Sequence, residues 1–236
     1  MGVNNQFDWV DFYKELADKL LYYKLDRDAL IKKVLEIYKN ADISMPKLEK
    51  DNKLVDIDPF TFFGLFNKKI TDENRIKLLK AIAELFQIKA PIPKSFASLP
   101  VLSPQNATFY YFIPDRGEDD IQDLWELFDY ALSYTKSRDN KTLQSLSSYF
   151  DLNIQKKGNG NSKITMGLYW IAPDTFLNLD QRNVWYIYDS GKFPEDFVKT
   201  LPSVESKMSS SDYFTITNKL RSFLNSEKSN SRISKN

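Results

Sequence analysis

The chain has 236 residues, of which 42% are hydrophobic and 14% aromatic, and its 33 Lys and Arg almost balance 32 Asp and Glu. The composition predicts a folded protein with a sizeable core, and the net charge of +1 excludes a positive field over the whole molecule, so any basic surface is local. Cysteine and histidine are absent, which excludes disulfides, thiol and imidazole catalysis and the usual zinc ligands.

The first ninety residues predict four helices. Apolar residues recur at steps of three and four over 7–24 and again over 26–40, which indicates a helical hairpin. After a polar loop, Asp58 and Pro59 open a short helix that carries four phenylalanines and must be covered by other parts of the chain. A fourth helix begins at Thr71 and ends before Pro91.

Four prolines between Pro91 and Pro104 predict an extended crossing and an internal boundary. We therefore expect a helical lobe over 1–98, a helical and aromatic lobe over 99–225 that packs with it as one unit, and a disordered tail over 226–236. The expected fold class is α+β and predominantly α-helical, a helical bundle-like domain with a few short strands.

In the second half, the aromatic run over 109–113 predicts a short strand that ends at Pro114. An acidic first turn then opens a helix over about 118–132, and a further helix is expected over 139–150. The stretch 164–170 fits either a strand by alternation or a helix by spacing, and we favour the helix. A short helix near Pro194 and a last amphipathic helix from Asp212 complete the pattern.

The sequence shows no recognisable catalytic or targeting motif. No phosphate-binding Gly-x-x-x-x-Gly-Lys-Ser/Thr loop occurs. Asp196, Glu205 and Lys207 match a metal nuclease only loosely, and they lie in a Ser-rich segment without a strand to hold them. The chain is therefore expected not to be an enzyme and to need no cofactor or metal. It shows no secretion signal and no apolar run of ~18 residues, so we expect a cytoplasmic protein that does not enter a membrane.

Three groups place amines and amides near aromatic residues, and they are the candidate DNA-binding residues. The first group is Asn67, Lys68, Lys69 and Arg75; the second is Tyr169, Trp170, Arg182 and Asn183; the third is Lys156, Lys157 and Lys163 around a Gly-Asn-Gly turn. Lysines can contact phosphates, Asn and Arg can pair with base edges, and aromatic rings can hold an unstacked base. A purely structural role is open for each group, since Arg182 can pair with Asp180 or Asp174 and Trp170 can belong to the core.

Three blocks of the sequence resemble the N-terminal region of bacterial McrB-like restriction ATPases. They are Asp56-Ile-Asp-Pro-Phe-Thr-Phe-Phe-Gly-Leu-Phe-Asn, Ile121-Gln-Asp-Leu-Trp-Glu-Leu-Phe and Met166-Gly-Leu-Tyr-Trp-Ile-Ala-Pro-Asp-Thr-Phe-Leu-Asn-Leu-Asp-Gln-Arg-Asn. The resemblance covers about 7–225 and implies a target-sensing module ahead of a AAA-type motor that recruits a nuclease to foreign or modified DNA. No motor sequence follows in this chain, so it is expected neither to hydrolyse nucleotide nor to cleave.

The expected function is therefore DNA binding and target recognition in a McrB-like restriction system for phage defence. The expected partners are DNA, with a modified cytosine as one target, and separate motor and nuclease subunits. Arg182, Asn183 or Asn67 is expected to contact the bases. Two alternatives stay open: a protein-interaction adaptor, favoured by the near-neutral charge and the acidic segment 118–120, and a small-molecule or nucleotide sensor near Trp170 and Trp185.

Overall fold

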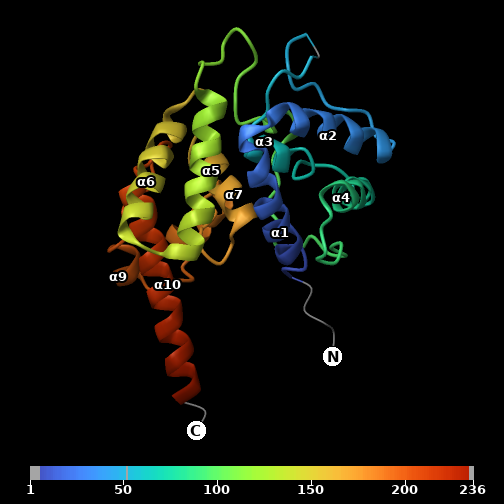
Figure 1. Ribbon diagram of the computed structural model, residues 1–236. Coiled ribbons are helices and arrows are strands. Elements are labelled where there is room, and N and C mark those ends of the chain that lie inside the picture. The colour runs from blue at the N-terminus through green and yellow to red at the C-terminus, as the bar shows by residue number, and fades with distance from the viewer. Residues whose placement is uncertain (1–5, 52, 234–236) are drawn as a thin grey trace.

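The computed structural model describes residues 6–51 and 53–233, and this part of the chain is mostly helical (Figure 1). The α-helices are α1 Val10–Leu20, α2 Arg27–Asn40, α3 Pro59–Gly64, α4 Asp72–Phe86, α5 Asp120–Ser137, α6 Asn140–Gln155, α7 Asn161–Ile171, α8 Gln181–Tyr188, α9 Glu195–Val198 and α10 Ser210–Ile233. Two 3-10 helices, Leu21–Leu25 and Pro104–Asn106, lie between them. The predominantly helical expectation is confirmed. No helix in the described part is both long and apolar enough to cross a membrane.

Side-chain caps explain where several helices begin. The capping residues, each of which accepts a hydrogen bond from a backbone amide of the first turn, are Asp26 for α2, Asp58 for α3, Thr71 for α4, Asp139 for α6 and Asp180 for α8. The ambiguous stretch over 164–170 lies in α7, as favoured from its spacing. Helix α8 was not predicted, although Asp180 supplies its start signal.

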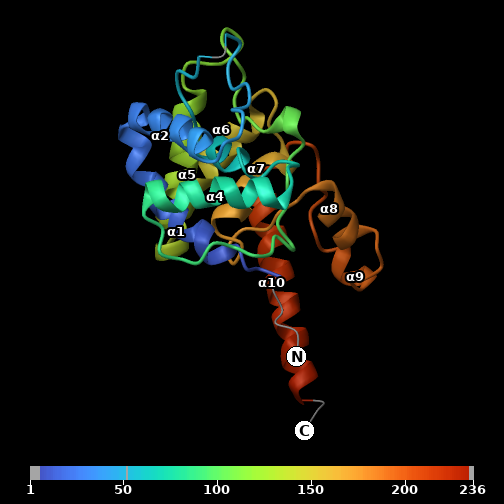
Figure 2. The same ribbon diagram turned by 90° about the vertical axis from the view of Figure 1, so that its right-hand side faces the viewer.

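The helices form two groups with α3 and α7 between them. Helices α5 and α6 pack along each other beside α10, whereas α1, α2 and α4 lie on the other side (Figure 1). Helix α3 contacts both α5 and α7, and α1 contacts α7. Helices α8 and α9 form an arm beside α10, where the rings of Phe197 and Phe223 stack with centroids 4.4 Å apart (Figure 2). Segments before and after the predicted boundary therefore share one core.

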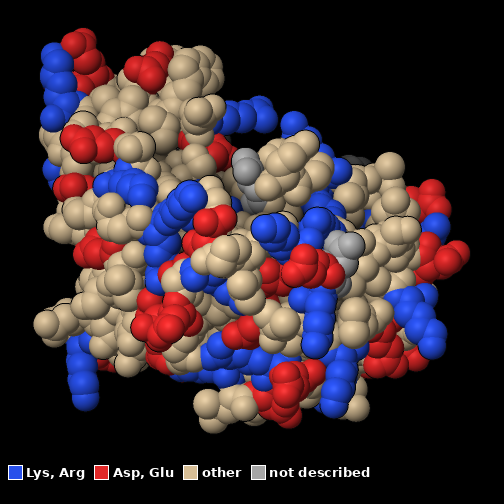
Figure 3. Space-filling model, turned by 90° about the horizontal axis from the view of Figure 1, so that it is seen from above, with Lys and Arg blue, Asp and Glu red and all other residues tan. Residues whose placement is uncertain are grey.

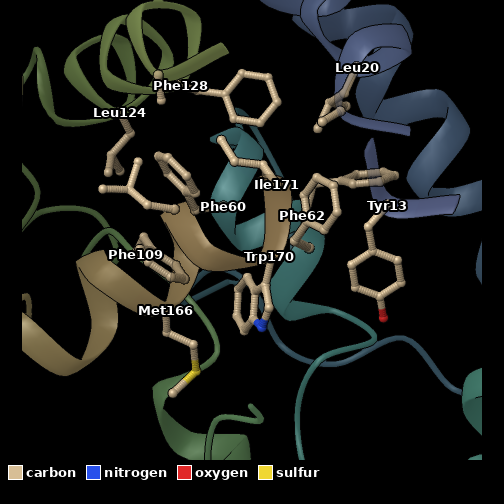
Figure 4. Close-up of a cluster of buried hydrophobic side chains, with 14 of the residues drawn as sticks. Tyr13, Leu20, Phe60, Phe62, Phe109, Leu124, Phe128, Met166, Trp170 and Ile171 are labelled. Carbon is tan, nitrogen blue, oxygen red and sulfur yellow. The ribbon is translucent and has the colours of Figure 1, made fainter. Parts of the chain in front are cut away.

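Aromatic rings fill the centre of this core around α3. The Phe60 ring lies 5.5 Å from that of Phe109 and 5.6 Å from that of Phe128, so α3 joins the 109–113 segment to α5 (Figure 4). The indole of Trp170 donates a hydrogen bond to Pro100 O at 2.9 Å. A Cβ atom added to Gly64 would lie 2.4 Å from Ala107 O, so only glycine allows this approach of α3 to the chain.

The strand predicted over 109–113 is wrong, because no strand occurs in the described residues and only an isolated bridge joins Lys68 to Leu102. Phe109 instead bonds to side chains: its N–H donates to Thr61 Oγ1 at 2.7 Å, and its carbonyl accepts from Asn159 Nδ2 at 3.1 Å. These side chains satisfy the backbone groups that a neighbouring strand would otherwise bind.

The segment predicted as a disordered tail is instead helical over most of its length. Helix α10 continues to Ile233 and extends beyond the body of the molecule (Figures 1 and 2). The remaining residues of the predicted tail, 234–236, lie outside the described part of the chain.

Candidate functional site

The first predicted group mainly stabilises the fold. Arg75 is buried, and its guanidinium donates to Phe66 O at 2.9 Å and to Lys68 O at 3.1 Å while it lies over the Phe96 ring. Asn67 is also buried, and its Oδ1 accepts a hydrogen bond from Tyr13 Oη at 2.7 Å. These contacts hold both side chains in the interior, so the prediction that Asn67 and Arg75 touch DNA is wrong.

The two lysines of this group differ in exposure. Lys68 is half-buried, and burial lowers the pKa of its amine. Lys69 is exposed, with its backbone N–H bonded to Leu102 O. Of these two lysines, Lys69 is therefore the one that a partner at the surface can reach.

The second predicted group does not assemble a base-binding surface. Trp170 is completely buried, which agrees with the alternative that it belongs to the core, so it presents no ring to a base. Tyr169 is half-buried, with its ring centroid 5.8 Å from that of Trp9. Asn183 donates from Nδ2 to Asn178 O at 2.9 Å. Arg182 is exposed, and its guanidinium forms no hydrogen bond or ion pair with the described residues. Arg182 is thus the member of this group that can reach a partner.

The Trp170 and Trp185 indoles, proposed above as a sensor pocket, lie in different surroundings. Trp170 is sealed in the core, whereas Trp185 on α8 is 56% exposed. A ligand at the surface can contact Trp185 only.

The third predicted group lies at the turn between α6 and α7, and its three lysines have different surroundings. Lys156 forms ion pairs with Asp120 at 2.8 Å and Asp123 at 2.6 Å, which neutralise its charge locally. The Lys157 amine is 4.6 Å from the centroid of the Tyr111 ring. The Lys163 amine is 5.3 Å from the centroid of the Phe109 ring and donates to Gly158 O at 3.1 Å.

An aromatic cavity of about 380 Å³ lies beside this turn. It is lined by Lys50, Gln105, Thr108, Tyr110, Tyr111, Phe112, Ile113, Asp115, Gly158 and Lys163. Gly158 has φ +81°, and a Cβ atom there would lie 2.4 Å from Tyr111 Cε2. The turn therefore needs glycine both for its backbone conformation and for its contact with the ring.

A second cavity, here called the loop cavity, lies against the same turn and has a volume of about 470 Å³. It is lined by Leu102, residues 158–163, Leu179, Gln181, Val184, Val204, Glu205 and Ser206. Gly158 and Lys163 line both cavities, so the Lys163 side chain lies where they adjoin.

The buried carboxyl group of Asp58 affects the pKa of Lys163. Burial lowers the pKa of the Lys163 amine to about 8, and the negative charge of Asp58 opposes this change. Burial raises the pKa of Asp58 to about 6, although hydrogen bonds from Thr61 and Phe60 and the charge of Lys163 act in the opposite direction. The site thus contains two ionisable groups whose pKa values both move toward neutrality.

The surrounding surface carries both signs of charge. The loops over 42–51, 53–55 and 107–119 lie at the end of the molecule seen in Figure 3, where Lys and Arg are interspersed with Asp and Glu. Arg116 in this region pairs with Glu49. The described residues contain no group of three Asp or Glu placed to hold a metal ion. The site therefore offers local amines beside aromatic rings rather than a broad basic face.

Residues 9–236 match the family described as a domain of unknown function, DUF8425. The chain belongs to the DUF8425 family. No curated protein and no solved structure matches the chain. The DUF8425 match includes α1 to α10, so both cavities lie within the family's domain.

The rings that line the site in this DUF8425 chain were missed from the sequence. Tyr111 and Phe112 were assigned to a strand, and Lys50 to an unremarkable polar loop. One usable signal was the Phe-Tyr-Tyr-Phe run over 109–112, which ends close to a proline and offers more rings than a short strand buries. Nothing in the local sequence of the turn indicated that this run would lie against Gly158.

Proposed function

We propose that the chain is the DNA-binding, target-recognition module of a McrB-like restriction system for phage defence, acting in the cytoplasm, and that the aromatic cavity holds one nucleotide of the target. The observation that carries the proposal is that Tyr111 and Lys163 both line this cavity, while the Lys157 amine lies 4.6 Å from the centroid of the Tyr111 ring. The resemblance of three sequence blocks to McrB-like proteins gives the biological setting. Motor and nuclease subunits, as separate partners, carry out translocation and cleavage.

The chemistry of the cavity suits a nucleotide. An unstacked base can lie on an aromatic face, which stabilises binding by ~1–3 kcal/mol per base, while amines neutralise the adjacent phosphates. A volume of about 380 Å³ falls within the range of ~300–1,000 Å³ typical of ligand pockets. A base displaced from a duplex, with or without a modified cytosine, would therefore be held by Tyr111 and tethered by Lys157.

The contribution of the other predicted residues follows from their exposure. Lys69 and Arg182 are exposed and can add phosphate or base contacts, whereas Lys156 is already paired with two aspartates. Binding is expected to weaken with salt in proportion to the few phosphates contacted, because each neutralised phosphate releases condensed counterions.

Fluorescence anisotropy with plain and cytosine-modified duplexes, at two salt concentrations, tests the proposal. Tyr111→Ala is expected to weaken binding roughly 5- to 150-fold, the equivalent of ~1–3 kcal/mol. Lys157→Ala is expected to reduce the slope of log K against log salt by about 0.9. Lys199→Ala is the matched control, since Lys199 directly follows α9 and pairs with Glu195.

Absence of binding to every duplex at low salt would end the proposal. Binding that survives in Tyr111→Ala with an unchanged affinity would remove the cavity from the mechanism and leave a surface contact only.

A protein-interaction module is the second candidate, and α8 favours it. Trp185 and Tyr186 are 56% and 46% exposed, and such side chains often dominate the energetics of protein interfaces. Co-purification of the chain with a motor or nuclease subunit after nucleic acid has been digested, and its loss in Trp185→Ala, would support this candidate. Retention of the partner by Trp185→Ala would exclude α8 as the contact.

A further inference from the structure

Lys163 differs from the neighbouring lysine in having no carboxylate partner at ion-pair distance. Lys156 pairs with two aspartates, whereas none of the ion pairs in the described part of the chain includes Lys163. The Lys163 amine instead contacts a carbonyl oxygen and the face of the Phe109 ring, and the side chain lines both cavities. It is therefore a weakly paired amine that a ligand in either cavity can approach.

Partial burial makes this amine more reactive than a surface lysine. Its pKa falls from 10.5 to about 8 because burial disfavours the charged form. At pH 7 about a tenth of the amine is uncharged, compared with about 3 in 10,000 at the ordinary pKa, so the nucleophilic form is enriched on the order of 10²-fold. Asp58 supplies the opposing charge from α3, and Lys50, Asp115 and Glu205 line the two cavities.

We propose that Lys163 is a covalent attachment site that forms an imine with the aldehyde group of a phosphate-bearing ligand. The uncharged Nζ attacks the carbonyl carbon and forms a C–N bond. The nitrogen passes one proton to the carbonyl oxygen, which gives a carbinolamine. The hydroxyl group of the carbinolamine then takes up a proton and leaves as water while the nitrogen gives up its second proton, and a C=N bond remains. One amine and one aldehyde thus give one imine and one water molecule, and no oxidant or reductant is needed.

The side chains around the aromatic cavity determine which class of ligand fits it. The rings of Tyr110, Tyr111 and Phe112 give the aromatic cavity planar walls. Lys50 also lines the cavity, and the Lys157 amine contacts the Tyr111 ring, so both place positive charge nearby. A planar or sugar aldehyde with a phosphate therefore fits better than a simple aliphatic aldehyde. Such an aldehyde can belong to a DNA strand, as in the ring-opened sugar of an abasic site, or to a free small molecule. An aldehyde on DNA rests on the proposed function, whereas a free aldehyde does not.

Reductive trapping of the full chain tests the attachment with two probes. One arm uses a duplex that contains a single abasic site, and the other uses pyridoxal 5′-phosphate, each with cyanoborohydride to convert the imine into a stable amine. Peptide mapping by mass spectrometry then measures modification at every lysine. Lys163 is expected to be modified at least roughly tenfold faster than the median lysine in one arm or both, with a rate that rises through an apparent pKa of about 8.

The pattern across the arms identifies the source of the aldehyde. Enrichment at Lys163 in the duplex arm alone assigns the DNA strand, and enrichment in the pyridoxal phosphate arm assigns a free ligand. Modification of Lys163 no faster than the median lysine in both arms overturns the proposal, and this result needs no variant that could fail to fold.

Two variants separate the chemistry from folding and from DNA binding. Lys163→Arg keeps a positive charge and is expected to lose the dominant adduct, whereas Lys199→Arg, directly after α9, is expected to keep it. Circular dichroism checks that both variants are folded. Anisotropy with an undamaged duplex is measured in parallel, so that a failure to bind DNA, which concerns the proposed function, is distinguished from a failure to form the adduct.

Discussion

The free energy of unfolding of the wild type is expected to fall between about pH 4 and pH 7 as Asp58 ionises. Replacement of Asp58 by Asn is expected to abolish this fall. Asp58 is fully buried, and its Oδ1 accepts hydrogen bonds from the amides of Phe60 at 2.8 Å and Thr61 at 2.9 Å. Its Oδ2 is buried and has no hydrogen-bond partner among the described residues. Asn keeps the capping oxygen and is a good residue at this position, but it does not ionise.

The magnitude follows from the pKa of the carboxyl group. Burial raises the pKa of Asp58 from 3.8 to about 6, and this difference of about 2.2 corresponds to as much as about 3 kcal/mol. Because the folded-state pKa lies above the unfolded-state value, the folded protein binds more protons in this window. The stability contributed by protonated Asp58 is therefore complete below about pH 3.8 and is lost as the pH rises through about 6.

Urea unfolding of the wild type and Asp58→Asn at intervals from pH 4 to pH 8 measures this loss directly. Other titrating groups cancel in the difference between the two proteins, so the free energy of unfolding of the wild type should fall relative to the variant by up to about 3 kcal/mol. Asp139→Asn is the matched control at another helix start. Hydrogen bonds from Ser137 and Thr142 lower the pKa of Asp139 to about 2, so its difference curve should be flat over this range.

A flat difference curve for Asp58→Asn as well would show that the folded protein ionises Asp58 as easily as the unfolded chain does. The argument from its burial would then be refuted.

Two further substitutions test the packing around α3. Gly64→Ala is expected to destabilise the fold by about 1–3 kcal/mol although alanine favours helices, because the new Cβ would lie 2.4 Å from Ala107 O; a rise in the midpoint of urea unfolding would contradict this. Tyr13→Phe is expected to lower the free energy of unfolding by about 1–3 kcal/mol, since it leaves the buried Asn67 Oδ1 without a donor. Thermal unfolding measures this loss. The control Tyr22→Phe, at an 81% exposed position, should stay within about 0.5 kcal/mol of the wild type.

Most of the helices could be predicted because their signals are local. Asp26, Asp58 and Thr71 are each followed by apolar residues at helical spacing, and the structure has a capped helix at each. Helix α8 escaped because the exposed Trp185 and Tyr186 stand between its inward-facing residues Val184, Ile187 and Tyr188, so the sequence reads as a continuous apolar run. The 109–113 segment was misassigned because an aromatic run has the same local pattern whether its backbone bonds to a strand or to side chains.

The candidate site was predicted only in part because its contacts join distant segments. The turn with Lys157 and Lys163 was identified from composition, but its ring partner Tyr111 comes from before α5. Asn67 and Arg75 look like surface contacts beside two lysines until Tyr13 and Phe96 are known to cover them. Burial of a polar residue depends on such long-range partners, which local spacing does not specify.

Helix α3 has a consequence for how the molecule opens. All six of its residues are buried, and its neighbours α5 and α7 come from the other half of the chain. The amide hydrogens of α3 cannot reach solvent unless those neighbours separate, so their exchange with deuterium should report global unfolding rather than a local fluctuation. A six-residue helix that could not exist alone is thus expected to be among the slowest-exchanging parts of the protein.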